Sequence, residues 1–170
     1  EDILSLYEKY PLKELIIHTR LQKDFYKLPT RPHTFLRAKE RLHTKLCYNG
    51  DIFSKADLDK VIKLDLDIQN VMLGRGLIAN PNLIREIKGE NFVSKEVIGA
   101  FMEELLLDYQ TNMSGGERVL LYKMKEIWCY LGASFTNSEK YLKRIKKASY
   151  LTDYRIAVRE LLSEQELIGL

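Results

Sequence analysis

Two short stretches decide the fold of this chain: Cys47-Tyr48-Asn49-Gly50-Asp51, which follows an apolar run, and Val71-Met72-Leu73-Gly74-Arg75-Gly76, which ends the next such run. In each, a pattern typical of a buried strand stops at a small or amide residue. Strands that are buried on both faces of a parallel sheet form unbroken apolar runs of this kind. Glycine after a strand lets backbone N–H groups approach an anion closely. The two stretches therefore predict a parallel sheet that binds a phosphate group at one edge.

Helices and strands alternate around these two stretches. Apolar residues at helical spacing run from Ile3 to Tyr10, where Pro11 stops them. The expected elements after Pro11 are a strand at Leu15–Ile17, a helix at Phe35–Leu42, a strand at Leu46–Tyr48, a helix at Ser54–Leu64 with Ser54 and Asp57 as its capping box, and a strand at Asn70–Leu73. This βα alternation is typical of a parallel sheet.

The pattern changes after Gly89, where no further strand is indicated. Long helices are expected at Ser94–Tyr109, Gly116–Leu131, Ser138–Lys147 and Thr152–Leu162. Their expected core consists of Leu105, Leu106, Tyr109, Leu120, Leu121, Met124, Ile127, Trp128, Leu131, Leu142, Ile145, Val158, Leu161 and Leu162. We therefore predict two domains, residues 1–90 and 91–170.

Length and composition limit the fold and its setting. A chain of 170 residues that is 45% hydrophobic buries a real core, but a complete (β/α)8 TIM barrel usually needs about 250 residues. The α/β part is therefore expected to be a partial TIM barrel, about its last three βα units, followed by an all-α bundle. Cys47 and Cys129 lack metal-ligand or disulfide spacing, which favours a reducing, cytoplasmic setting without a metal site. No apolar run approaches the roughly 20 residues of a membrane span.

Positive charge is concentrated in two segments, although the net charge is only +3. One segment runs from Arg20 to Lys45 and the other from Lys140 to Arg159. Such segments are usually solvated faces. Tyr141, Tyr150 and Tyr154 accompany the second segment, and aromatic rings beside cations are typical of surfaces that bind RNA.

Several motifs together resemble the tRNA-dihydrouridine synthases, FMN-dependent enzymes with a barrel and a helical domain that helps to hold tRNA. The matching pieces, in the family's order, are His18-Thr19-Arg20, Tyr26, Asn49-Gly50-Asp51, Met72-Leu73-Gly74-Arg75-Gly76 and Asn80-Pro81. The segment from Arg118 to Leu131, with Trp128 and Tyr130-Leu131, is similar to the helical-domain signature, and the helix from Lys140 to Lys147 also fits.

The resemblance implies reduction of uridine to 5,6-dihydrouridine in tRNA, with FMN as cofactor and NADPH as reductant. It implies an FMN site in which His18 contacts the isoalloxazine ring, and Gly74 and Arg75 hold the phosphate. The full set of implied cofactor-binding residues is His18, Arg20, Asn49, Gly50, Asp51, Gly74 and Arg75, with loop capping as the preferred role of Asp51. The implied RNA-binding residues are Arg118, Lys140, Lys143, Arg144, Lys146 and Lys147.

The resemblance also predicts what this chain lacks. It places the first residues just before the sixth strand of the family's barrel, so the segment with the catalytic cysteine is missing. Cys47 and Cys129 do not occupy that position. We therefore expect no catalytic residue in this chain, no activity of the chain alone, and self-association through open sheet edges. The segment Lys27–Pro32 departs from the family by lacking small residues.

Simpler interpretations stand beside these. His18 at a strand end is often structural, Asn49-Gly50 is a common turn, and Arg75 alone is more often a surface charge. One rival function is another FMN barrel oxidoreductase that acts on a small molecule, such as a dihydroorotate-type dehydrogenase. A second rival is a helical RNA-binding module without enzymatic activity, carrying a vestigial β/α segment.

Overall fold

The computed structural model describes residues 2–64, 67–91 and 93–168, and the chain divides into two compact units. The units are Glu1–Gly76 and Leu77–Leu170, so the division falls earlier than the expected boundary after residue 90. Hydrogen bonds explain the difference. The Asn82 side chain accepts a bond of 2.7 Å from the backbone N–H of Val93, and Ser134 Oγ donates to the carbonyl of Ala79. These bonds join the segment before residue 90 to the helices that follow it.

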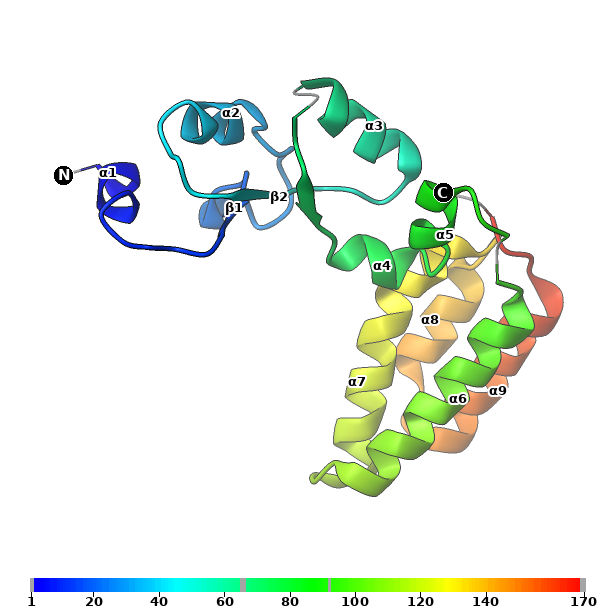
Figure 1. Cartoon of the computed structure of the whole chain (residues 1–170). Coiled ribbons are helices and arrows are strands. Elements are labelled where there is room, and N and C mark those ends of the chain that lie inside the picture. The colour runs from blue at the N-terminus through cyan, green and yellow to red at the C-terminus, as the bar shows by residue number, and fades with distance from the viewer. Residues whose placement is uncertain (1, 65–66, 92, 169–170) are drawn as a thin grey trace. The chain divides into compact units, whose positions relative to one another are not determined.

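The first unit contains the predicted parallel sheet (Figure 1). Its strands are β1 (Leu15–His18), β2 (Leu46–Asn49) and β3 (Asn70–Met72), hydrogen-bonded in the order β1-β2-β3. The register pairs His18 with Asn49 and Asn49 with Met72, so the carboxyl ends of all three strands lie side by side. The α/β class and the three parallel strands are confirmed.

The helices of the first unit begin where local signals place them. They are α1 (Ile3–Tyr7), α2 (His33–Lys39) and α3 (Lys55–Leu64), with the short 3-10 helix η1 at Gln22–Asp24. The Ser54 cap of α3 is confirmed, since the Asp57 N–H donates to Ser54 Oγ at 3.2 Å. The Asp57 carboxylate accepts from Ser54 Oγ at 3.0 Å and from the Phe53 N–H at 3.3 Å, one residue before the N–H that a capping box uses. Helix α2 follows Pro32, whose fixed φ suits the start of a helix. Its Phe35 ring packs 5.4 Å from the ring of Tyr48 and covers one face of the sheet.

The second unit is helical. The short helix α4 (Arg75–Ala79) begins before the division, and α5 (Leu83–Lys88), α6 (Lys95–Asn112), α7 (Gly116–Leu131), η2 (Gly132–Ser134), α8 (Glu139–Lys147) and α9 (Leu151–Glu164) follow. All fourteen expected core residues lie in one cluster, either buried or packed against it. Trp128 is fully buried, and its Nε1 donates to Tyr154 Oη at 2.8 Å. Burial raises the pKa of the Tyr154 phenol, which stays neutral inside this core.

Burial corrects one expectation about the aromatic residues near the basic helix. Tyr141 and Tyr154 are 1% and 2% exposed, so neither ring can stack on RNA. Tyr150 is 67% exposed and remains accessible. Within the described residues, none of the helices is both long and apolar enough to cross a bilayer.

Candidate functional site

Three polar side chains meet where the strands of the sheet end. Arg20 follows β1, Asp51 follows β2 and Arg75 follows β3. The Asp51 carboxylate binds both guanidinium groups: Oδ1 lies 2.8 Å from Arg75 Nη2, and Oδ2 forms an ion pair with Arg20 Nη2. Parallel strands bring their carboxyl ends to one edge, which is where ligands of β/α folds bind. We call these three side chains the Arg20–Asp51–Arg75 cluster.

Charge and burial make the cluster a candidate binding site for an anion. Two guanidinium groups outweigh one carboxylate, so positive charge remains in excess. The Arg20 side chain is only 4% exposed, and its Nε and Nη1 atoms are buried without a hydrogen-bond partner among the described residues. Buried donors in proteins are nearly always paired, and each unpaired one lowers stability. The arrangement therefore presents two donors of Arg20 to an acceptor such as a phosphate or carbonyl oxygen.

Aromatic rings lie against the cluster. The Arg75 guanidinium carbon is 3.6 Å from the centroid of the Tyr26 ring and 5.7 Å from that of Phe53, which are cation–π distances. The His18 ring meets Tyr26 edge-on at 6.2 Å between centroids. The contact of Phe53 with Arg75 was not predicted, because nothing in the sequence pattern around Phe53 marks it.

The remaining predicted cofactor residues differ in their exposure and in their packing. His18 is exposed at the end of β1, and Asn49 Nδ2 lies 3.5 Å from Met72 Sδ. Gly74 is exposed, and a Cβ atom added to it would meet nothing within 4 Å. A Cβ atom at Gly50 would lie 2.4 Å from Tyr48 Oη, so the structure requires glycine there for packing. The open space beside the backbone is at Gly74.

Asp51 has a different function from the capping expected of it. Ser54 and Asp57 cap α3, whereas Asp51 binds the two arginines. Two guanidinium groups repel each other at close range, and a carboxylate between them offsets that repulsion. Asp51 therefore holds Arg20 and Arg75 together.

A loop between β1 and α2 places Tyr26 over Arg75. Phe25 and Tyr26 adopt left-handed backbone conformations, with φ of 44° and 61°. Buried Asp24 anchors this loop: its Oδ2 accepts hydrogen bonds from Arg31 Nη1 at 2.5 Å and from the Leu21 N–H at 3.1 Å. The hydrogen bond from Arg31 holds the pKa of Asp24 below its usual range. We call the Asp24–Arg31 pair the loop clasp. Arg31 belongs to the segment Lys27–Pro32, which lacks the small residues expected from the family.

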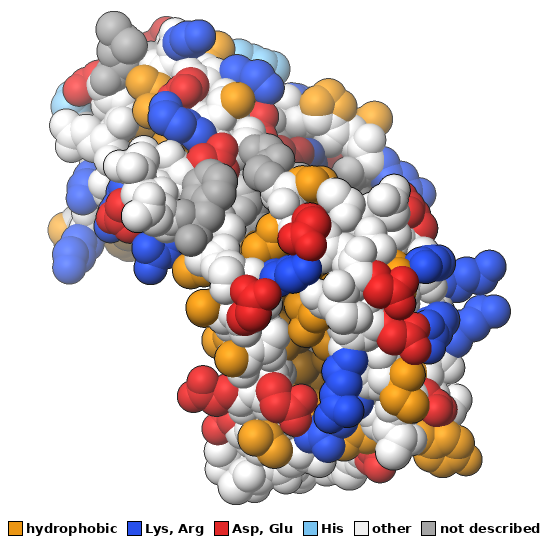
Figure 2. All heavy atoms as spheres, turned by 90° about the vertical axis from the view of Figure 1, so that its right-hand side faces the viewer, with side chains coloured by type: hydrophobic (Ala, Val, Ile, Leu, Met, Phe, Trp, Pro, Cys, Tyr) orange, Lys and Arg blue, Asp and Glu red, His pale blue; other side chains and the backbone are white. Residues whose placement is uncertain are grey.

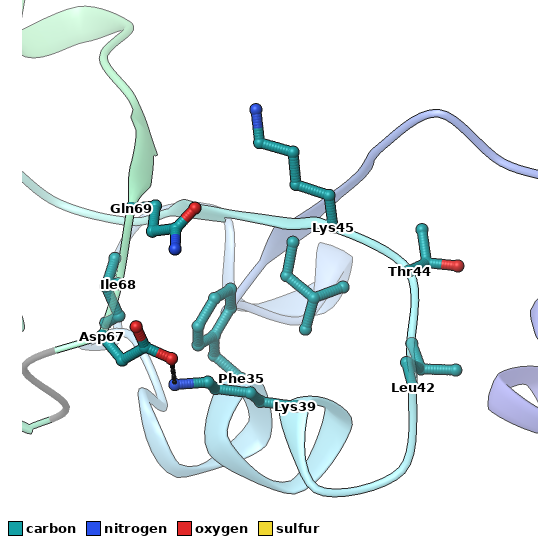
Figure 3. Close-up of a pocket in the computed structure, with 9 residues that line it drawn as sticks. Phe35, Lys39, Leu42, Thr44, Lys45, Asp67, Ile68 and Gln69 are labelled. Carbon is teal, nitrogen blue, oxygen red and sulfur yellow. Dashed lines mark hydrogen bonds and ion pairs between the residues drawn. The ribbon is translucent and has the colours of Figure 1, made fainter.

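A separate pocket of about 240 Å³ lies at the opposite end of the sheet (Figure 3). It is lined by residues that precede β2 and β3, among them Lys45, Ile68 and Gln69. Lys39 and Asp67 also line it, and the Lys39 ammonium lies 3.1 Å from Asp67 Oδ2. None of the predicted site residues lines this pocket, so the candidate site is the carboxyl edge.

The six predicted RNA-binding residues are all exposed on helices of the second unit. Two of them are already paired: Lys140 Nζ lies 3.4 Å from Glu164, and Arg144 Nη2 lies 3.0 Å from Glu160. The other four, Arg118, Lys143, Lys146 and Lys147, form no ion pair within the described part of the chain. Among the residues that the structure describes, no carboxylate is paired with these four positive charges.

Comparison with known proteins assigns the family. The model of the dihydrouridine synthase (Dus) family matches residues 2–165, nearly the whole chain. This chain belongs to the dihydrouridine synthase family.

Individual relatives agree with the assignment. A tRNA-dihydrouridine(16) synthase of Shewanella oneidensis is 26% identical over 148 residues, which are 86% of this chain and 45% of the relative. A protein of the same name from Pseudomonas syringae is 31% identical over 84 residues, 47% of this chain and 26% of the relative. One from Neisseria meningitidis serogroup B is 32% identical over 74 residues, covering 44% of this chain and 22% of that protein. The chain therefore spans less than half the length of these dihydrouridine synthases.

Proposed function

We propose that the protein to which this chain belongs is a cytoplasmic, FMN-dependent tRNA-dihydrouridine synthase that reduces uridine in tRNA with NADPH. This chain contributes the last βα units of the TIM barrel and a helical tRNA-binding domain, without the catalytic cysteine. The observation that carries the proposal is the Arg20–Asp51–Arg75 cluster at the carboxyl edge of the sheet, in a chain of this family.

The residues at this edge fit FMN. The unpaired donors of Arg20 and the excess positive charge suit the anionic parts of the cofactor. The open space at Gly74, beside Arg75, allows a phosphate group to approach the backbone. His18 and Asn49 pair with each other across the neighbouring strands β1 and β2, and both offer polar atoms for the edge of the flavin ring. When bound, FMN supplies the hydride chemistry that reduces the uracil ring.

The residues of this chain position the cofactor and the tRNA and do not take part in the chemical step. Asp51 fixes the two guanidinium groups, so that Arg75 faces the phosphate as a rigid donor. Tyr26, held by the loop clasp, covers Arg75 and reduces its contact with water. In the helical unit, the four cations without ion pairs bind the tRNA backbone. A uridine must leave its stack to reach the flavin, and these phosphate contacts offset that unfavourable step.

A fluorescence titration of this chain with FMN tests the proposal. Gly74→Ala is the most informative variant, because its Cβ would touch nothing in the protein and would disturb only a ligand. We expect native binding to weaken at least tenfold in both Gly74→Ala and Arg75→Ala, since each loses a phosphate contact of about 1.5–3 kcal/mol. Arg85→Ala removes an exposed arginine of the helical unit and serves as the matched control. Equal FMN affinity of Gly74→Ala and the native chain would contradict this assignment.

Activity provides an independent check. We expect this chain, mixed with FMN, NADPH and tRNA, to form no dihydrouridine, because the proton donor of the reaction lies outside it. Product formation by the chain alone would show that one of its own residues is catalytic.

A further inference from the structure

Helices α7 and α8 form an exposed surface at one end of the helical unit. Two contacts fix their arrangement: Lys125 Nζ donates to the carbonyl of Ala148, and Glu117 accepts a bond of 2.7 Å from the Leu151 N–H. The first half of α7 therefore lies beside the end of α8 and the start of α9. Arg118 and Tyr122 are four residues apart, so they share the side of α7 that Lys125 extends toward α8.

Two tyrosines stand out on this surface. Tyr122 is 69% exposed and Tyr150, just before α9, is 67% exposed. The other tyrosines of α8 and α9, Tyr141 and Tyr154, are buried in the core. Tyr122 and Tyr150 therefore contribute little to packing and present their rings to solvent.

The charge of α8 is divided between its two sides. Lys140 and Arg144 face α9, where Glu164 and Glu160 neutralise them. Lys146 comes four residues after Leu142 and shares its side of α8, and the Leu142 side chain lies against Gly132, just after α7. Lys147 comes seven residues after Lys140 and shares the side toward α9. Within the part of the chain that the structure describes, neither Lys146 nor Lys147 forms an ion pair. Figure 2 shows Lys and Arg side chains along one side of the helical unit, with Asp and Glu side chains beside them.

We propose that Arg118, Tyr122, Lys146 and Tyr150 form a surface that binds an unpaired segment of RNA, with both tyrosine rings stacked on bases. We call it the α7–α8 surface. The inference rests on the proposed tRNA substrate and goes further by assigning base contacts. Cations alone would bind any polyanion, including duplex RNA. Exposed rings among such cations fit bases that are free to stack, as they are in loops and single strands.

Fluorescence anisotropy with the whole chain tests this assignment. The probes are a labelled single-stranded RNA, a duplex of the same sequence, and an unmodified tRNA. We expect Tyr122→Leu and Tyr150→Leu each to weaken single-strand and tRNA binding about tenfold, the scale of one lost base–aromatic stack. Tyr122→Phe and Tyr150→Phe keep the ring and should bind as the native chain does. Duplex binding should not change in any of these four variants.

The dependence of RNA affinity on salt concentration distinguishes base stacking from contacts between cations and phosphates. The Tyr→Leu variants should keep the native slope of affinity against salt, because they remove no phosphate contact. Lys146→Gln should lower that slope by about one counterion. Lys88→Gln, an exposed lysine of α5 that lies 3.9 Å from Glu90, and Tyr10→Leu, an exposed tyrosine of the first unit, are matched controls that should bind normally.

The outcomes distinguish this inference from the proposed function. Native affinity of both Tyr→Leu variants for single-stranded RNA would overturn the base contacts while leaving tRNA binding intact. Equal binding of single strand and duplex by the native chain would show that the surface recognises charge alone, which also overturns the inference. If the native chain bound no RNA at all, the tRNA substrate proposed for this part of the protein would fail, and the α7–α8 surface with it.

Discussion

Phe25 carries backbone strain that its side chain does not offset. Its φ is 44° and its ring is 72% exposed, so the residue lies in a left-handed conformation without a packing gain. Such a conformation costs a non-glycine residue roughly 1–2 kcal/mol. We therefore expect Phe25→Gly to raise the free energy of unfolding by about 1 kcal/mol, measured by urea denaturation.

Phe101 provides the control for this substitution. It is 59% exposed but lies within α6, where glycine is unfavourable. Phe101→Gly should destabilise the chain by about 1 kcal/mol, the opposite sign. Destabilisation by Phe25→Gly would show that the exposed ring contributes more to stability than the strain removes.

Individual site residues differ in how far the sequence determines them. The family resemblance assigned Arg20, Asp51 and Arg75 to one cofactor site, and the register of the parallel strands brings their positions to one edge. The ion pairs of Asp51 with both arginines were not predicted. The stacking of Tyr26 on Arg75 depends on two positive φ angles, which no spacing pattern encodes. Gly50 was associated with a phosphate, whereas its lack of a side chain accommodates Tyr48. The three-dimensional structure is needed to tell a glycine that makes room for a neighbouring side chain from a glycine that makes room for a ligand.

At the scale of elements, the loop clasp makes the β1–α2 loop sensitive to acid. Arg31 lowers the pKa of Asp24 in the folded state. A carboxyl whose folded pKa is lowered contributes stability above its unfolded pKa and loses that contribution as the pH falls toward the folded value. We expect cleavage in this loop by an acid-active protease to increase as the pH falls through and below the ordinary aspartate range.

A clasp variant shows whether Asp24 is responsible. Asp24→Asn should make the loop susceptible to cleavage already at neutral pH, because it removes the charged acceptor of Arg31. Lowering the pH should then increase cleavage of this variant only slightly. Asp59→Asn, which breaks an exposed pair with Lys55 on α3, should leave cleavage of this loop unchanged. A native acid response in Asp24→Asn would assign the effect to another carboxyl group.

Element prediction succeeded where a local pattern was long enough. The helices α6 to α9 and the three strands follow from periodicity and capping, with ends that differ by a few residues. Helices α4 and α5 have five and six residues, too few to establish a helical period. The division into compact units falls before the expected boundary for a related reason: the bonds between Asn82 and Val93 and between Ser134 and Ala79 join residues that no local pattern relates.

At the scale of the whole molecule, the two units have separate cores, and we expect them to unfold separately. Trp128 is the only tryptophan of the chain and is buried in the helical unit, so its fluorescence reports on that unit alone. Gly50→Ala would force a Cβ against Tyr48 and should destabilise the first unit by about 1–3 kcal/mol. The part of the circular dichroism transition that comes from the first unit should shift. The unfolding transition followed by Trp128 fluorescence, which comes from the helical unit, should not shift. A parallel shift of both signals would show that the units unfold together.

The sheet itself predicts self-association of this chain. Its order is β1-β2-β3, so β1 and β3 each have one side without a strand partner in the described structure. Ile16 on β1 and Met72 on β3 are 49% and 43% exposed, which leaves apolar surface beside these open edges. Open edges of this kind pair with other chains unless charge or cover prevents it. We therefore expect sedimentation velocity to show dimers or larger species whose share rises with concentration. Ile16→Lys places a charge at the edge and should shift the chain toward monomer, whereas Leu107→Lys on α6 should not. A monomer at every concentration would mean that the edges are protected, and an unchanged distribution in Ile16→Lys would place the contact elsewhere.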